Sequence, residues 1–383
     1  MQNTPLVSVL LPYHNDELFI KEAVKSVLSS SFKNFELIIL NHASEDSSRK
    51  IVRSFRDLRI KHFEMPKNYG AGGGLLFETM LSHAQGKYIK PFCADDVMRP
   101  NGLAELVNYL EEHHNVDFAF GDIKYIDKNG NHLRDSWFSS RQGFTRSCQN
   151  EDLILKFIHG ESVLPWVGSI VRKSALDQIL IDKTLIMLFD VSIWVSLLCK
   201  NYKISYLNKI VANYRIHPNQ VSALENKDMS SALCQFEHPV IYKILLSITD
   251  IGLAKKIFPE SPYKNKLDSK DDIAFFIAHS LLYKFWALSY QVLNDMLSNK
   301  DQMDYLSGKY NYDTATLRSD CRKIIETQLI HSQSENKLKK MNFKQRIYSK
   351  SMKELSIMDL AYLAIRKLSS VKKIWRKKKP YSL

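Results

Sequence analysis

The first 120 residues alternate short apolar runs with amphipathic segments, and this alternation restricts the fold more than any other feature of the sequence. Apolar runs of strand length occur at residues 6–11, 35–40, 60–63, 88–92 and 118–120. Segments with helical spacing of apolar residues lie between them, at 17–29, 48–55, 75–84 and 103–112. Strands that alternate with helices usually form a parallel sheet covered on both faces. The sequence therefore predicts an α/β fold for this part of the chain.

The region after residue 122 is organised differently. An Asn-Gly turn at residues 129–130 predicts a hairpin, and residues 166–171 have the composition of another strand. A helix is predicted at 189–199, and strands at 203–206 and 210–214.

Strand signals end near residue 228, and helical patterns follow at 240–248, 273–297 and 316–330. We therefore expect three parts: an α/β domain at 1–225, an α-helical C-terminal region at 226–336 and a basic amphipathic tail at 337–383.

The net charge of the chain is concentrated at its C-terminal end. The 383 residues carry a net charge of +13. Residues 337–383 hold fifteen Lys and Arg and two acidic residues, so this segment accounts for the whole net charge. A neutral body with a basic tail indicates docking on an anionic partner. No nucleic-acid-binding motif accompanies the charge, so nucleic acid is not expected as the partner.

The tail also has the pattern of a helix that lies in a membrane interface. Residues 355–365 are apolar but too short to span a bilayer, and residues 371–379 combine Trp375 with clustered Lys and Arg. We expect residues 355–379 to dock on an anionic membrane surface. Packing on the protein body and self-association are the alternatives, and a homo-oligomer through the helical region is a further expectation.

The cysteines and the N-terminal sequence indicate the compartment. The five cysteines are scattered, without a Cys-x-x-Cys pair, and the first residues are polar rather than those of a signal peptide. A reduced, cytoplasmic protein is expected.

Polar side chains follow three of the predicted strands where each strand ends. The first strand leads into residues 12–17, the second into Asn41 and His42, and the fourth into Asp95 and Asp96. This edge of an open parallel sheet binds ligands, and adjacent acids there can hold a divalent cation against a phosphate. Each loop taken alone also fits ordinary turn chemistry.

The order and spacing of these segments resemble the family-two glycosyltransferases of GT-A fold. The resemblance covers roughly residues 5–222 and rests on residues 9–15, on 35–46 with Ser44 and Asp46, and on 86–96. It implies a mostly parallel central sheet with helices on both faces, followed here by an α-helical C-terminal region. It also implies sugar transfer from a nucleotide-diphosphate sugar in bacterial polysaccharide biosynthesis, such as that of capsule or lipopolysaccharide.

The resemblance implies a donor site with a divalent metal. The residues expected to contact the nucleotide-sugar are Pro12, Tyr13, Asn15, Glu17, Asn41, His42, Asn68, Gly70, Asp95 and Arg215. Within this set, Asp95 is expected on the ribose. Asp96 is expected to bind Mn²⁺ or Mg²⁺ bridging the diphosphate. Arg215 or His217 would hold the diphosphate or complete the metal shell.

A second match lies at residues 189–194, which resemble the helix start that carries the catalytic base in this family. Asp190 would deprotonate a hydroxyl of a glycan or lipid-linked acceptor. That hydroxyl would attack the anomeric carbon opposite the leaving diphosphate, which inverts its configuration. An aspartate that caps the helix is the structural alternative. With a lipid-linked acceptor, the enzyme would work at the cytoplasmic face of the inner membrane.

Three positions depart from the family pattern. Asn41 and His42 stand where two acids are usual, so uracil is favoured as the donor base while another base stays open. Cys93 stands where the first acid of the Asp-x-Asp-Asp run is common. Phe189 replaces the first acid of the usual Glu-Asp pair and makes the acceptor side locally apolar.

Features of the sequence also fit three other functions in part. The first is a Rossmann dehydrogenase, because the glycine-rich loop at 70–74 partly fits a dinucleotide fingerprint. However, Leu75 stands where the last glycine of the fingerprint is expected, and six residues separate Gly70 from the preceding strand. These glycines either let the backbone approach the diphosphate or pack closely. A nucleotidyltransferase would share the acid pair. Such an enzyme typically has a basic glycine-rich loop directly after the first strand, and this sequence has none there. A catalytically degenerate binding or scaffold protein is the remaining alternative.

Overall fold

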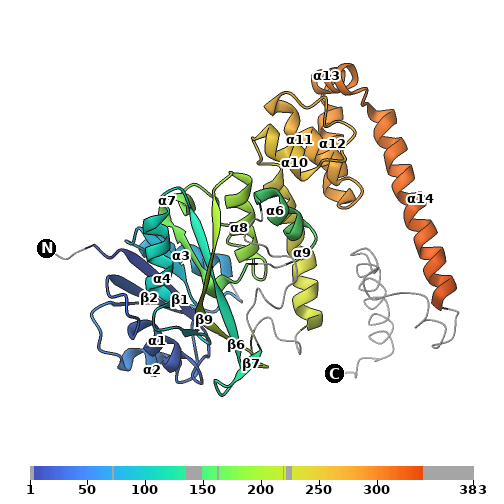
Figure 1. Ribbon diagram of the computed structural model, residues 1–383. Helices are drawn as coiled ribbons and strands as arrows, with labels where there is room; N and C mark the ends of the chain where they lie inside the picture. Colours follow the sequence, from blue (N-terminus) through green and yellow to red (C-terminus); the bar gives the residue numbers. More distant parts are fainter. Residues whose placement is uncertain are drawn as a thin grey trace. The chain divides into compact units, whose positions relative to one another are not determined.

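The computed structural model describes residues 4–70, 73–134, 149–161, 164–218, 220 and 227–339 (Figure 1). The chain divides into two compact units, Met1–Ser289 and Tyr290–Leu383. The first unit holds the sheet and every predicted site residue.

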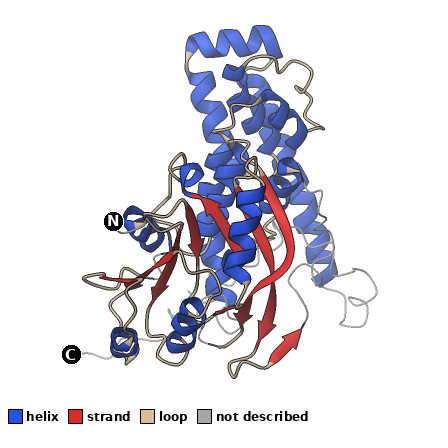
Figure 2. Ribbon diagram, turned by 60° about the vertical axis from the view of Figure 1, so that its left-hand side comes forward, coloured by secondary structure: helices blue, strands red, loops and turns tan. Residues whose placement is uncertain are grey.

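The first unit is built on one nine-stranded sheet, seen as the red strands in Figure 2. Its order is β3-β2-β1-β4-β8-β6-β9-β5, with β7 paired to β6. The strands are β1 (Val7–Tyr13), β2 (Phe35–Asn41), β3 (Ile60–Glu64), β4 (Tyr88–Pro91), β5 (Val97–Met98), β6 (Phe118–Ile126), β7 (His132–Arg134), β8 (Ser169–Arg172) and β9 (Ile204–Arg215). The first four are mutually parallel, as are β6 and β9, whereas β5, β7 and β8 are antiparallel to their neighbours. The expected mostly parallel α/β sheet is confirmed.

Alternating apolar residues of the strands supply two hydrophobic cores, one on each face of the sheet. Val9 of β1 faces a core shared with α1 (Ile20–Leu28), α2 (Ser48–Ser54) and α4 (Gly102–Glu112). Leu10 faces a larger core on the other side of the sheet. That core is shared with α3 (Gly73–His83), α6 (Asn150–Ile158), α7 (Lys173–Leu176), α8 (Phe189–Cys199), α9 (Lys227–Leu245), α10 (Ile251–Ile257) and α11 (Ile273–Leu281).

In two places the structure joins or divides the predicted elements. The strands predicted at 203–206 and 210–214 form the single strand β9, because a bulge where Gly121 and Asp122 pair with it keeps it on β6. The helix predicted at 273–297 is two helices, α11 and α12 (Trp286–Ser298). The chain turns between them, where Phe285 stacks on Tyr242 of α9.

The second unit continues α12 with α13 (Lys300–Tyr310) and α14 (Thr314–Lys339). The predicted basic tail lies outside the described residues, apart from its first residues at the end of α14. No helix in the described ranges combines the length and apolarity that crossing a membrane requires.

Candidate active site

The predicted site residues gather at the edge of the sheet where the parallel strands β1, β2 and β4 end. The acid-bearing segment follows β4 directly. Arg215 ends β9, and its backbone N–H donates to Asp96 Oδ1 at 2.8 Å, which joins β9 to that segment. The sequence separation between these two residues is 119, so only the folded sheet brings them together.

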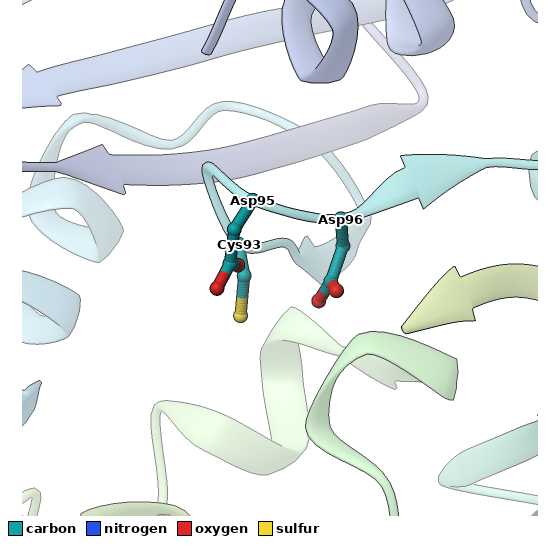
Figure 3. A group of neighbouring side chains, drawn as sticks. All are labelled: Cys93, Asp95 and Asp96. Atoms are coloured by element: carbon teal, nitrogen blue, oxygen red, sulfur yellow. The ribbon is translucent and has the colours of Figure 1, made fainter. Parts of the chain in front are cut away.

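Cys93, Asp95 and Asp96 form a compact cluster in the loop after β4 (Figure 3). The thiol sulfur and one carboxylate oxygen from each aspartate lie within 4.8 Å of one another. Figure 3 shows the three side chains directed to the same side of the loop. Such a group could hold a cation, since each side chain offers it one ligand atom.

Asp96 has a carboxylate oxygen without a partner. The residue is only 1% exposed, and Oδ1 is occupied by the Arg215 N–H, whereas the buried Oδ2 has no hydrogen-bond partner among the described residues. The Cys93 thiol lies close enough to interact with this carboxylate. Burial raises the pKa of Asp96 well above its usual range, and the neighbouring Asp95 charge raises it further. A buried, unpaired carboxylate oxygen is destabilising unless a cation or donor faces it. The chemistry of the cluster therefore fits a divalent metal.

His217 and Arg215 both contact Asp95. His217 Nε2 lies 3.0 Å from Asp95 Oδ2. The Arg215 guanidinium is 1% exposed and donates to Asp95 O, Asp127 O, Lys128 O and Glu22 Oε2. Arg215 thereby ties the acid loop to the β6–β7 turn and to α1.

The loops after β1 and β2 interlock through side-chain to backbone hydrogen bonds. Asn15 adopts a left-handed backbone with φ of 55°, and its Oδ1 accepts from the N–H groups of Glu45 and Asp46. Glu17 donates its N–H to Asp46 Oδ2, and Glu17 Oε2 accepts from Ser47 N. Asn15 and Glu17 are therefore brought to the site and hold the two loops together.

The acceptor atoms of Asn41 and His42 are engaged within the protein. Asn41 Oδ1 accepts from Ser44 N at 2.9 Å, and His42 Nε2 accepts from Tyr69 N at 2.9 Å. Burial lowers the pKa of His42, and the nearby His14 lowers it further, which keeps the ring neutral. Among the described residues, the Asn41 amide nitrogen has no hydrogen-bond partner.

The other residues predicted to contact the nucleotide-sugar lie around these loops. Tyr13 is 5% exposed, so its ring lies in the core on the α1 side of the sheet, where burial raises its pKa to about 12. Pro12 is half-buried and pairs in register with Leu40. Asn68 donates to His14 Nε2 at 3.0 Å, and its Oδ1 accepts from the N–H of Gly70, whose φ is +84°.

The glycine-rich loop brings the start of α3 against the start of α8. A Cβ on Gly73 would lie 2.2 Å from the Phe189 ring, and one on Gly74 would lie 2.1 Å from Asp182 O. Gly73 and Gly74 are thus required for close packing, the second of the two predicted roles. The Phe189 ring also meets Trp166 of the 3₁₀ turn Trp166–Gly168, with 5.0 Å between centroids.

Asp190 lies in the first turn of α8, beside these packing contacts. Its Oδ1 accepts from Val191 N at 2.7 Å. Burial raises the pKa of Asp190 to about 6, and the Glu237 charge adds to the shift. A half-buried carboxylate with this pKa is suited to act as a base near neutral pH.

Two acids at the site were not identified from the sequence. Glu237 of α9 accepts backbone hydrogen bonds from Ile186, Met187 and Leu188, the segment that leads into α8. Asp16 accepts from His14 N at 2.9 Å, and burial raises its pKa to about 6, with the Asp95 charge adding to the shift. Neither acid belongs to a recognisable sequence pattern, so their place at the site follows only from the residues that surround them in the fold.

Comparison with known proteins agrees with this architecture. Residues 8–180 match the family described as glycosyl transferase family 2. The chain carries a family 2 glycosyltransferase domain. This domain has the GT-A fold, because the structure is similar to that of S. aureus TarS 1–349 in complex with UDP-GlcNAc. The two are 18% identical, with a TM-score of 0.52 over 85% of this chain and 92% of that one.

Relatives of the family 2 domain occur in both archaea and bacteria. An uncharacterized glycosyltransferase of Methanocaldococcus jannaschii, MJ1057, is 27% identical over 56% of this chain and 72% of its own length. The Escherichia coli UDP-Glc:alpha-D-GlcNAc-diphosphoundecaprenol beta-1,3-glucosyltransferase WfgD is 26% identical over 68% of this chain and 97% of its own length. Four other curated relatives are matched over 21–52% of their own length.

Proposed function

We propose that this chain transfers a sugar from a nucleotide-diphosphate sugar to a hydroxyl of a glycan or lipid-linked acceptor, with inversion at the anomeric carbon. The observation that carries the proposal is the unpaired Asp96 Oδ2 within the Cys93, Asp95 and Asp96 cluster at the binding edge of a GT-A sheet. A leaving diphosphate develops negative charge, which such a cation site is suited to neutralise.

The donor side of the proposed site consists of the interlocked loops. Asp95 contacts the ribose, and Asp96 holds Mn²⁺ or Mg²⁺, with His217 beside them. When bound, the ion would supply charge neutralisation at the diphosphate. The residues proposed to line the nucleotide-sugar are Pro12, Tyr13, Asn15, Glu17, Asn41, His42, Asn68, Gly70 and Arg215.

Uracil is the proposed donor base. The unpaired Asn41 amide nitrogen is a donor, and the uracil edge offers carbonyl oxygens as acceptors. Two similar proteins also support uracil, since the structure of TarS was solved with UDP-GlcNAc and the name of WfgD includes UDP-Glc.

The acceptor side of the proposed site is organised by Asp190. This carboxylate takes the proton of the attacking hydroxyl, and its pKa of about 6 leaves most of it ionised at neutral pH. Attack opposite the leaving diphosphate gives inversion. The Phe189 and Trp166 rings beside it make an apolar wall against the acceptor.

We also propose that the acceptor is presented at the cytoplasmic face of the inner membrane. The name of WfgD includes a diphosphoundecaprenol acceptor. The basic, apolar pattern of residues 355–379 matches an anionic membrane surface. Truncation before Lys337 should abolish co-sedimentation with anionic vesicles, and unchanged co-sedimentation would remove the membrane proposal.

A nucleotide-sugar panel with Mn²⁺ tests the transfer itself, using the wild type and Asp96→Ala. We expect turnover by the wild type and a loss of turnover in the variant. Absence of both binding and turnover across the panel would defeat the proposal.

The internal engagement of Asn41 Oδ1 and His42 Nε2 favours one second candidate, a binding protein without transferase activity. The same panel separates the two candidates. In the second case a nucleotide-sugar binds the wild type, but no product forms.

A further inference from the structure

We propose that the Cys93 sulfur is itself a ligand of the divalent ion, so that this site prefers later first-row metals that accept sulfur, such as Co²⁺ and Zn²⁺, over Mg²⁺. This inference rests on the proposed function, because the ion would serve the donor diphosphate. It adds the identity of a ligand and the chemical class of the metal.

The geometry of the cluster accommodates one ion between the thiol and the carboxylates. Cys93 Sγ and the carboxylate oxygens of Asp95 and Asp96 lie within 4.8 Å of one another. Ligand atoms on opposite sides of an ion with bonds of 2.0–2.3 Å are separated by up to about 4.5 Å. Small side-chain adjustments therefore bring these atoms onto a common ion.

Asp96 provides an independent indication of a ligand at this position. Its Oδ1 is fixed by Arg215 N, so the side chain is oriented, and its Oδ2 is buried without a hydrogen-bond partner in the part of the chain that the structure describes. Asp95 is differently placed, since its Oδ2 lies beside His217 Nε2. Asp96 Oδ2 is thus the oxygen free to share an ion with Cys93 Sγ.

The thiol is held in place by the end of β4. Lys90, which is fully buried, donates from Nζ to Pro91 O at 2.9 Å and to Val167 O at 2.5 Å. These bonds fix the backbone just before Cys93. Figure 3 shows Sγ on the same side of the loop as both carboxylates.

The chemistry of the ligand set decides the metal class. A metal ion that binds here displaces the thiol proton, so Cys-SH and M²⁺ give Cys-S-M⁺ and one H⁺ released to solvent. Mg²⁺ prefers oxygen ligands and gives up its waters reluctantly, whereas thiolate ligands favour later first-row ions. A carboxylate at position 93 would restore an all-oxygen set.

Co²⁺ is the probe for the thiolate bond, because a thiolate-to-cobalt charge-transfer band appears only when sulfur binds the ion. Absorption spectra are recorded with Co²⁺ alone and with Co²⁺ plus UDP. The proteins are the wild type, Cys93→Ser, Cys93→Asp and the control Cys321→Ser, which removes a thiol of α14. We expect the band in the wild type and in the control, and its loss in both Cys93 variants. No band in the wild type, or a band that persists without the Cys93 thiol, would overturn the inference.

Metal preference gives a second readout. It compares two metals on the same protein sample, so a variant that is only partly folded still reports the ratio of the two affinities. Calorimetric titration with Zn²⁺ and with Mg²⁺ should show Cys93→Asp reducing the Zn²⁺ preference by about tenfold. An unchanged preference would contradict a sulfur ligand.

The two proposals fail separately. A cobalt band without turnover of any nucleotide-sugar keeps the sulfur ligand and removes the transferase. Metal-dependent turnover without the cobalt band keeps the transferase and removes the sulfur ligand.

Discussion

The carboxylate of Glu237 accepts a 2.7 Å hydrogen bond from the backbone N–H of Leu188, two residues before Asp190. It also accepts from Ile186 N at 2.7 Å and from Met187 N at 2.9 Å. One buried side chain of α9 therefore satisfies three N–H groups that precede and open α8. The segment that carries the proposed base is held by a helix 49 residues further along the chain.

Glu237→Gln should shift the pH dependence of kcat, because it removes a charge that raises the pKa of Asp190 while keeping an acceptor oxygen. The acid limb of the profile moves to lower pH. Glu237→Ala removes the hydrogen bonds and should lower kcat about tenfold, equivalent to roughly 1.4 kcal/mol in the barrier. The donor KM stays unchanged in both variants.

Glu260→Gln is the matched control for this experiment, since it removes the charge of an exposed glutamate. Cys234 and His238 of α9 also lie close to Glu237 and are left in place. A Glu237→Gln profile that coincides with the wild type would show that this carboxylate has no influence on the base.

Asp190 itself should set the acid limb of the wild-type profile. The base acts in its ionised form, so kcat rises with pH through about 6 and reaches a plateau above it. Asp190→Asn should abolish transfer and keep donor affinity, measured by titration with the nucleotide-sugar. Full transfer by Asp190→Asn would remove the base assignment, whatever the Glu237 variants do.

The sequence was sufficient to predict the sheet edge but not the contacts that complete the site. β1, β2 and β4 are mostly apolar, although Lys90 interrupts β4, so their boundaries and the loops after them follow from the hydrophobic pattern. β5 has only two residues, Val97–Met98, which is too short to give a periodic signal. The acid pair was correctly placed at the strand end because it follows such a run directly.

The roles of individual residues depended on tertiary neighbours. The sequence leaves open whether the glycine-rich loop approaches a ligand or packs closely. The Phe189 ring shows close packing at Gly73, whereas a Cβ on Gly70 would meet nothing within 4 Å. Likewise, the sequence leaves open whether Asn41 accepts a hydrogen bond from a donor base or donates one, and in the structure Ser44 N and Tyr69 N occupy the acceptor atoms of Asn41 and His42. Such partners come from other loops, so no local pattern encodes them.

Asp190→Asn should also stabilise the protein at neutral pH. Folding raises the pKa of Asp190 from 3.8 to about 6. The contribution of this group to stability is therefore complete below about pH 3.8 and is lost as the pH rises through about 6. The neutral amide avoids that loss, a gain on the order of 2 kcal/mol. Urea unfolding at pH 8 and pH 4 checks this, and an equal gain at both pH values would contradict the linkage.

Arg215→Lys should have a larger effect on the stability of the fold than on the affinity for the nucleotide-sugar donor. The buried guanidinium joins Asp95 O, Asp127 O and Glu22, and an ammonium cannot reach all of these acceptors. We expect a loss of about 3 kcal/mol in urea unfolding. Glu22→Gln, the control, keeps an acceptor oxygen on a half-exposed side chain and should lose less than about 1 kcal/mol. Wild-type stability with lost donor affinity would instead place Arg215 on the diphosphate.

Mn²⁺ should raise the thermal midpoint of the wild type and leave that of Asp96→Ala unchanged. The unpaired Asp96 Oδ2 is buried in the ion-free fold, and a cation that binds only the folded state stabilises it by mass action. At a Mn²⁺ concentration 100 times its Kd, the gain is about 2.7 kcal/mol. Asp271→Asn removes an exposed carboxylate of the same unit and should keep the full response to Mn²⁺. Melting curves with Mn²⁺ and with EDTA measure the difference. An equal shift in Asp96→Ala would mean that the ion binds elsewhere, and the cluster after β4 would then lose its assignment as the metal site.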